Sequence, residues 1–138
     1  MSRGLSVSMS VILLSLILSA CGGGNNPSTQ INVTMTDFAY SPNTFTVPAG
    51  AQISFSATNS GAVAHSFVIM NLGQNVGGHF TADDKSNVYW EQPEVPPGSS
   101  IQSTFTSPSD PGSYQVVCAN AGHFEAGMVA KLIVVPQP

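Results

Sequence analysis

The stretch Tyr114-Gln-Val-Val-Cys-Ala-Asn-Ala-Gly-His-Phe-Glu-Ala-Gly-Met128 places three metal-binding side chains within eleven residues: Cys118, His123 and Met128. Apolar and β-branched residues predict a strand on each side of it, Ser113–Cys118 and Met128–Val135. The glycines between them predict turns. The three side chains are therefore expected on a loop that joins two strands.

The chain between residue 30 and this loop also predicts strands. Short runs rich in Val, Ile, Phe, Thr and Ser alternate with Gly and Pro. Strands are expected at Ile31–Phe38, Thr44–Val47, Gln52–Thr58, His65–Met70 and Ser99–Ser107. A short helix is expected around Thr81–Asn87, with Thr81 as its cap. The final strand presents Met128, Ala130, Leu132 and Val134 on one face and Lys131 on the other.

About seven or eight strands in ~105 residues predict an all-β fold, a two-sheet Greek-key sandwich without an internal repeat or second domain. Composition agrees with a single folded unit. The chain has 138 residues, of which 42% are hydrophobic and 7% charged, against about 25% charged in ordinary globular proteins. Such a chain is too apolar for disorder. Three basic residues are too few for a nucleic-acid interface.

The first twenty residues predict a secretory signal. Arg3 precedes the apolar run Val11–Leu18, and small residues follow. A membrane-spanning helix is the alternative, but the run is broken by serine and is shorter than the ~20 residues that a span needs. Leu18-Ser-Ala-Cys21 resembles the lipobox of bacterial lipoproteins. The resemblance implies that Cys21 is acylated and becomes the mature N-terminus; an ordinary signal with a free or disulfide-bonded Cys21 is the alternative.

Three segments follow from this interpretation: a signal peptide at 1–20, an acylated Cys21 with a flexible Gly/Asn/Ser tether at 21–30, and a folded domain at 31–138. An acylated Cys21 cannot pair with Cys118, so Cys118 becomes an unpaired exported thiol. Such a thiol is usually capped, paired between chains, or used as a ligand or nucleophile. Loss of Arg3 leaves two lysines against seven acids, a formal charge of −5.

The available donors favour copper. His65 begins a predicted strand after a turn, and together with Cys118, His123 and Met128 it completes a set of two His, one Cys and one Met. This is the ligand set of blue-copper electron-transfer sites. Thiolate and thioether are soft donors that suit Cu(I), whereas imidazole suits both oxidation states.

The same residues resemble the cupredoxins, in particular the plastocyanin, azurin and auracyanin group. The segment Cys118–Met128 resembles their copper loop, while Phe45–Gly50, Asn59–Gly61 and His65–Phe67 resemble their first ligand region. The resemblance covers nearly all of 30–135 and implies one copper ion. Its ligands would be a ring nitrogen of His65 and of His123, the Cys118 thiolate and an axial Met128, with the carbonyl of Ala64 on the opposite axial side.

Two features depart from parts of this family. Many members have Asn directly after the first His, where it ties the ligand loops together; this chain has Ser66. Four residues separate Cys118 from His123, so the loop is longer than that of plastocyanin.

Other site chemistries are less compatible with the residue counts. Each donor alone could be an ordinary core residue. Three such residues on one loop, in the order found in the family, are improbable as a coincidence. Multicopper oxidases need further His-rich centres, and only His79 remains, which we expect to be an exposed loop residue. A binuclear copper site needs a second loop Cys, and structural zinc sites use four Cys/His ligands. A Cys118–His123 nucleophile pair lacks an evident orienting group, so we do not expect an enzyme.

The expected function is a one-electron carrier between membrane or periplasmic redox partners, such as a cytochrome or an oxidase or reductase. The His123 ring would be the electron port, inside an apolar docking patch of Ala62, Val63, Phe124 and Ala126. The protein is expected to be an exported monomer, lipid-anchored to a membrane and facing the periplasm or the cell exterior. A copper chaperone or storage module with the same ligands is the alternative. A degenerate binding module is a third, which the complete ligand set argues against.

Overall fold

The computed structural model describes Met1 and residues 26–137. Apart from Met1, the predicted signal peptide lies outside the described residues, as do Cys21 and residues 22–25 of the predicted tether. No helix within the described residues is long and apolar enough to cross a membrane.

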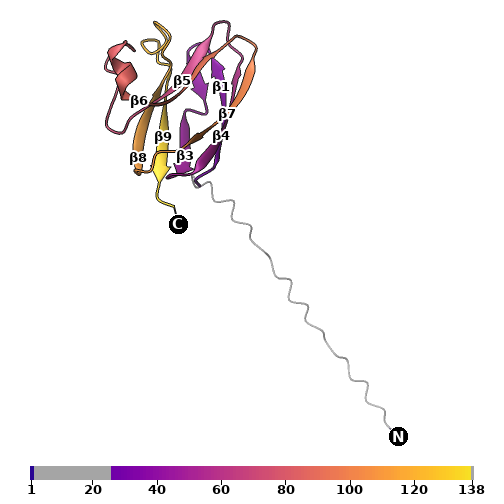
Figure 1. Ribbon diagram of the computed structural model, residues 1–138. Helices are drawn as coiled ribbons and strands as arrows, with labels where there is room; N and C mark the ends of the chain where they lie inside the picture. The colour runs from indigo at the N-terminus through magenta and orange to yellow at the C-terminus, as the bar shows by residue number, and fades with distance from the viewer. Residues whose placement is uncertain (2–25, 138) are drawn as a thin grey trace.

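Two β-sheets pack face to face and form a sandwich (Figure 1). The four-stranded sheet has the order β2-β1-β4-β7 and the five-stranded sheet the order β3-β9-β8-β5-β6. The pairs β1–β4 and β3–β9 are parallel, and the other pairs are antiparallel. The elements are β1 Gln30–Thr36, β2 Ala39–Ser41, β3 Thr44–Pro48, β4 Gln52–Asn59, β5 His65–Met70, the 3₁₀ helix η1 Asp83–Asn87, β6 Val88–Val95, β7 Ser100–Thr106, β8 Gly112–Val117 and β9 Val129–Val135.

The predicted all-β sandwich is confirmed, with nine strands in the described part of the chain rather than seven or eight. The two additional strands are β2 and β6. The short helix is present as η1, but the expected cap is wrong. Thr81 does not accept a bond from the helix; its backbone N–H and its hydroxyl each donate to Asp84 Oδ2 at 2.7 Å.

The core lies between the sheets, where β1 and β4 bury every second residue and β5 is buried along its whole length. In β1, Ile31, Val33 and Met35 are buried, and the residues between them are exposed. Phe67 in β5 lies at the centre of an aromatic cluster. Its ring centroid is 4.8 Å from that of Phe55 and 5.4 Å from that of Tyr40. These contacts fix the backbone of β5 two residues after His65, the first residue of the strand.

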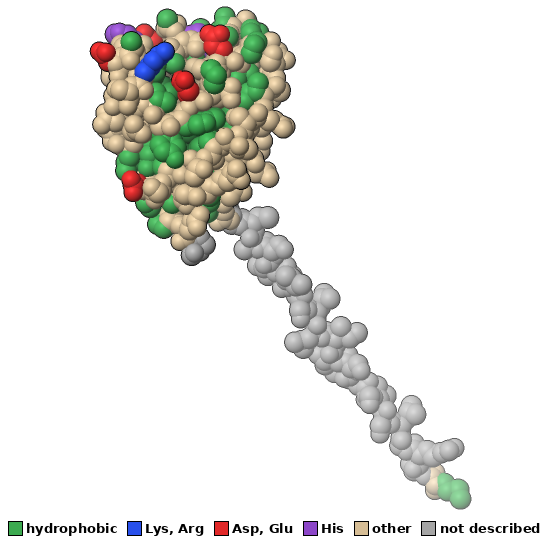
Figure 2. All heavy atoms as spheres, viewed as in Figure 1, with side chains coloured by type: hydrophobic (Ala, Val, Ile, Leu, Met, Phe, Trp, Pro, Cys, Tyr) green, Lys and Arg blue, Asp and Glu red, His purple; other side chains and the backbone are tan. Residues whose placement is uncertain are grey.

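The outer face of the four-stranded sheet carries few charges, which accounts for much of the low fraction of charged residues in the sequence. Strands β1, β4 and β7 present only uncharged polar side chains outward, and none is Asp, Glu, Lys or Arg. They are Gln30, Asn32, Thr34, Thr36, Gln52, Ser54, Ser56, Thr58, Ser100, Gln102, Thr104 and Thr106. On the face shown in Figure 2, most charged side chains and the histidines instead lie at one end of the sandwich, and one acidic side chain lies nearer the other end.

The sheet register brings the ends of β5 and β8 together at that end. Val68 pairs with Val117 and Ile69 with Val116, so the continued register sets Ser66 opposite Ala119. His65 opens β5 and Cys118 follows β8 directly. The loop between β8 and β9 lies there too, at the end opposite the described C-terminal segment (Figure 1).

Candidate metal site

Three donor atoms converge at this end of the sandwich. His65 Nδ1 lies 3.1 Å from His123 Nδ1, and Cys118 Sγ lies 3.3 Å from His123 Nδ1. All three donor atoms lie within 4.8 Å of one another. His65 and Cys118 are fully buried, whereas His123 is half-buried.

The convergence fits a bound metal ion. Nitrogen and sulfur ligands at about 2.0–2.3 Å from a metal in a trigonal plane lie ~3.5–3.7 Å apart, close to the separations found here. Two imidazoles and one thiolate suit copper. Met128 is fully buried in the same core cluster as Cys118, and its backbone carbonyl accepts a hydrogen bond from the N–H of Cys118 at 3.3 Å.

Turns hold His123 between Cys118 and Met128. The N–H of His123 donates to the Asn120 carbonyl at 3.1 Å, and its own carbonyl accepts from the Met128 N–H at 3.0 Å. Gly122 and Gly127 have φ values of 82° and 97°, a region that side chains with a Cβ rarely adopt. The glycines seen in the sequence therefore bend the loop so that His123 turns back toward Cys118.

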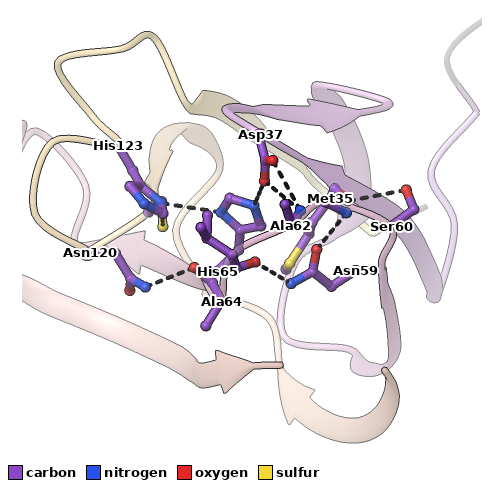
Figure 3. Close-up of polar contacts among 12 residues, drawn as sticks. Met35, Asp37, Asn59, Ser60, Ala62, Ala64, His65, Asn120 and His123 are labelled. Carbon is purple, nitrogen blue, oxygen red and sulfur yellow. Dashed lines mark hydrogen bonds and ion pairs between the residues drawn. The ribbon is translucent and has the colours of Figure 1, made fainter. Parts of the chain in front are cut away.

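Ser66 and Asn120 connect the two ligand segments. The Ser66 hydroxyl accepts a hydrogen bond from the Ala119 N–H at 2.9 Å and lies 3.3 Å from Asn120 Oδ1. The backbone N–H of Ser66 donates to Cys118 Sγ at 3.4 Å. Asn120 Nδ2 donates to the carbonyl of Ala64 at 2.9 Å (Figure 3). A serine and an asparagine together thus tie the loops, where many cupredoxins use one asparagine.

Asn59 fixes the turn before His65. Its side-chain amide donates to the carbonyls of Val63 and Val95, both at 2.8 Å, and its Oδ1 accepts from the Gly61 N–H at 2.9 Å. Asn59 is fully buried, and each of these bonds satisfies a group that would otherwise lose water without a partner. The turn is therefore held by hydrogen bonds that do not depend on a metal.

Asp37 lies on the side of His65 that faces away from the metal site. Its Oδ1 is 3.0 Å from His65 Nε2, and both carboxylate oxygens accept from the Ala62 N–H at 3.0–3.1 Å (Figure 3). The Ala62 N–H, and then the contact with His65, lower the pKa of the Asp37 carboxyl group. This residue belongs to the turn that follows β1.

Burial and neighbouring groups shift the pKa values of two side chains at the site, His123 and Tyr40. Burial, and then the nearby His65, lower the pKa of the His123 ring, which favours its neutral, metal-binding form. Beneath the site, the Tyr40 hydroxyl donates to the Ser66 carbonyl at 2.6 Å. Burial, and then the neighbouring Cys118, raise the pKa of Tyr40 well above its usual value. The hydroxyl therefore stays protonated as a donor.

The predicted electron port is partly covered. The Phe38 ring packs edge-on against the His123 ring with centroids 5.0 Å apart, and 41% of Phe38 is exposed. Ala62 and Val63 are exposed beside it. Phe124, expected in the same docking patch, is half-buried and packs against a second core cluster of Val68, Met70, Val76 and Val117. Ala126 is exposed on the loop.

The structure brings His65, Cys118 and His123 together, with Met128 adjacent and the Ala64 carbonyl held by Asn120. His79 is exposed, between β5 and η1. Three residues that shape the site were given no role from the sequence: Asp37, Phe38 and Asn120. Asn59 was expected only as part of the first ligand region. Asp37 offered one signal, because it is one of only seven acids in the sequence and directly follows an alternating run, where turns often begin.

The fold and the converging donors define a β-sandwich protein with a soft-metal site. Residues 8–134 match the family of cupredoxin-like domains, and the chain belongs to that family. The copper-resistant cuproprotein CopI of Rubrivivax gelatinosus is 33% identical over 110 residues. The match covers 75% of this chain and 65% of that protein, so the chain spans slightly less than two-thirds of its length.

Solved structures of copper proteins share the fold. Dithionite-reduced auracyanin from the photosynthetic bacterium Roseiflexus castenholzii is 28% identical with a TM-score of 0.68, and the match covers 80% of this chain and 99% of that one. Auracyanin A of Chloroflexus aurantiacus, described as a "blue" copper protein, is 24% identical with a TM-score of 0.61, over 77% and 99% of the two chains. The second likeness shows the fold alone. The family and the donor set together identify one copper ion as the cofactor.

We expect Asn59→Ala to destabilise the protein. The substitution leaves two carbonyls and one N–H without partners, and each buried group left unpaired costs about 1–3 kcal/mol. Urea unfolding of the metal-free protein should therefore show a loss of at least about 2 kcal/mol. Ser60→Ala is the matched control, because its hydroxyl makes one long contact of 3.4 Å to the Met35 carbonyl. An equal loss in the two variants would contradict the role assigned to Asn59.

Proposed function

We propose that this protein is a type 1 copper protein that carries single electrons. The observation that supports this most is the convergence of His65 Nδ1, Cys118 Sγ and His123 Nδ1 in a site that is already formed by strand register and hydrogen bonds. We assign the ligand roles to these three residues, with Met128 as a fourth residue that would hold the ion. A bound copper ion would supply the one-electron change between Cu(I) and Cu(II).

The residues around the site would limit rearrangement during that change. His65 is held on one side by Asp37, and Cys118 lies against the Ser66 N–H. Because both side chains are fully buried, water has little access to them. A fixed, dry arrangement of donors keeps reorganisation small, which favours fast electron exchange.

The exposed rings and methyl groups around His123 would form the contact with a redox partner. Phe38, Ala62 and Val63 are exposed there, and His123 reaches the surface among them. Small apolar contact areas suit short-lived electron-transfer encounters. The partner would be a cytochrome, or an oxidase or reductase, and the proposal assigns no substrate chemistry to the site.

We further propose that the protein is exported and anchored by lipid on Cys21. The support is the lipobox resemblance of Leu18–Cys21, and the described chain adds a geometric argument. β1 begins at the end of the sandwich away from the metal site (Figure 1). An anchor attached through the segment before β1 would leave His123 pointing away from the membrane, toward the periplasm or the cell exterior.

Copper handling is the second candidate. It is favoured by the 33% identity to a protein named for copper resistance. In this role the same ligands would store copper or pass it to an acceptor, and the transferred species would be the metal ion rather than an electron.

The first test is the visible spectrum. One equivalent of Cu(II) added to the purified domain should produce an intense thiolate-to-copper band, which Cys118→Ser should abolish. His79→Ala should retain the band because His79 is exposed outside the site. A colourless wild-type protein, or an unchanged band in Cys118→Ser, would overturn the proposed function.

The second test separates the two candidates. A carrier should be reduced and reoxidised repeatedly by a redox mediator while its copper stays bound against a Cu(I) chelator. Stopped-flow absorbance measures the electron exchange, and metal analysis after gel filtration measures copper retention. Rapid loss of Cu(I) to the chelator, with slow electron exchange, would favour copper handling instead.

The anchor is tested by labelling with fatty acid in a bacterial host that processes lipoproteins. Wild-type protein should carry the label and sediment with membranes, whereas Cys21→Ser should do neither. Cys118→Ser is the matched control and should keep the label. Labelling that survives in Cys21→Ser would refute the anchor without affecting the copper site.

A further inference from the structure

Asp37 contacts Nε2 of His65, the ring nitrogen that does not point at the metal site. His65 Nδ1 faces His123 Nδ1 at 3.1 Å, while His65 Nε2 lies 3.0 Å from Asp37 Oδ1. Because an ionised carboxylate can only accept, this contact requires the proton of a neutral His65 ring to be on Nε2. Nδ1 then keeps its lone pair for a metal.

The approach of Asp37 depends on Gly61. A Cβ at position 61 would collide with Asp37 Oδ1 and would lie 3.0 Å from His65 Nε2. The absent side chain therefore makes room for the contact between the carboxylate and the ring. Asn59 holds Gly61 in place by accepting its N–H.

A second anchor fixes the carboxylate itself. The Ala62 N–H lies 3.0–3.1 Å from both oxygens of Asp37. The Asp37 side chain is 34% exposed, whereas that of His65 is fully buried. The carboxylate is thus tied to the same turn that leads into His65, and its negative charge adjoins a ligand that water does not reach.

We propose that Asp37 is a positioning residue that sets the tautomer and the donor strength of His65, and through them lowers the reduction potential of the bound copper. This proposal rests on the proposed function. A carboxylate that accepts from the outer N–H of a metal-binding imidazole fixes the ring and raises its basicity. A more basic ring and a nearby negative charge both stabilise Cu(II) more than Cu(I), because Cu(II) carries the higher charge.

The test is Asp37→Asn, which keeps an oxygen acceptor for Ala62 and removes the charge. Loss of such an outer partner typically weakens metal binding about 10–100-fold, and we expect the loss to be larger for Cu(II) than for Cu(I). A tenfold difference between the two raises the reduction potential by about 59 mV. Affinities are measured by competition with chelators, and the potential by protein-film voltammetry. The thiolate band should remain.

Two matched variants control for charge. Glu125→Gln removes a carboxylate that acts on His123 through space and has no hydrogen bond to a ligand among the described contacts. Asp110→Asn removes one from the turn before β8, and the six residues of β8, about 20 Å at ~3.3 Å per residue, separate that turn from Cys118. Both should shift the potential much less than Asp37→Asn. Equal shifts in the three variants would overturn the proposal.

A metal-free readout separates this proposal from the copper function. In the apo protein, nitrogen NMR should find His65 protonated on Nε2, and Gly61→Ala should disturb that tautomer by displacing the carboxylate. Asp37→Glu should restore it in part. An unchanged His65 tautomer in both Asp37→Asn and Gly61→Ala would overturn the proposal even if copper binds. If the two variants lose the Nε2 tautomer but the wild-type protein binds no copper, the positioning role of Asp37 is supported. Only the proposed function is then contradicted.

Discussion

The pairing of β5 with β8 is the constraint on which the site depends. In an antiparallel pair, residues opposite each other point to the same face. The register of Val68 with Val117 therefore sets Phe67 opposite Cys118 on the inner face, and His65, two residues earlier, shares that face. A shift of one residue would turn Cys118 away from His65. The packed rings around Phe67 oppose such a shift, because it would expose them.

The hydrogen bonds around the donors refine what the register provides. Ser66 replaces the asparagine that many cupredoxins have after the first histidine, and the shorter side chain reaches Ala119 but not the Ala64 carbonyl. Asn120 makes that second connection. Because Asn120 bonds to Ala64, the Ser66 N–H and hydroxyl lie near Cys118 Sγ. Donors to the sulfur stabilise the thiolate, so the linkage between the loops and the chemistry of the sulfur are coupled in this chain.

Much of this could be predicted from sequence because the signals were local. The alternation in Gln52–Thr58 predicts a strand from adjacent residues, and the glycines around His123 predict turns in the same way. The types of donor on one loop restrict which metals can bind. Strand β6 was missed because it lies at the edge of its sheet and contains Pro93, which weakens a strand pattern. Asp37 was assigned to the first strand, whereas β1 ends at Thr36. Its partner His65 is 28 residues away, and such a contact depends on the parallel pairing of β1 with β4, which no local pattern reveals.

The positions of the donors imply that two nitrogens and one sulfur are in place before copper binds and move little when the charge of the copper changes. X-ray absorption at the copper edge, measured on the oxidised and the reduced protein, is the test. We expect two histidine nitrogens and one sulfur at bonding distance in both oxidation states, with nearly unchanged distances. A coordination shell without a short sulfur distance, or the loss of a histidine on reduction, would contradict it.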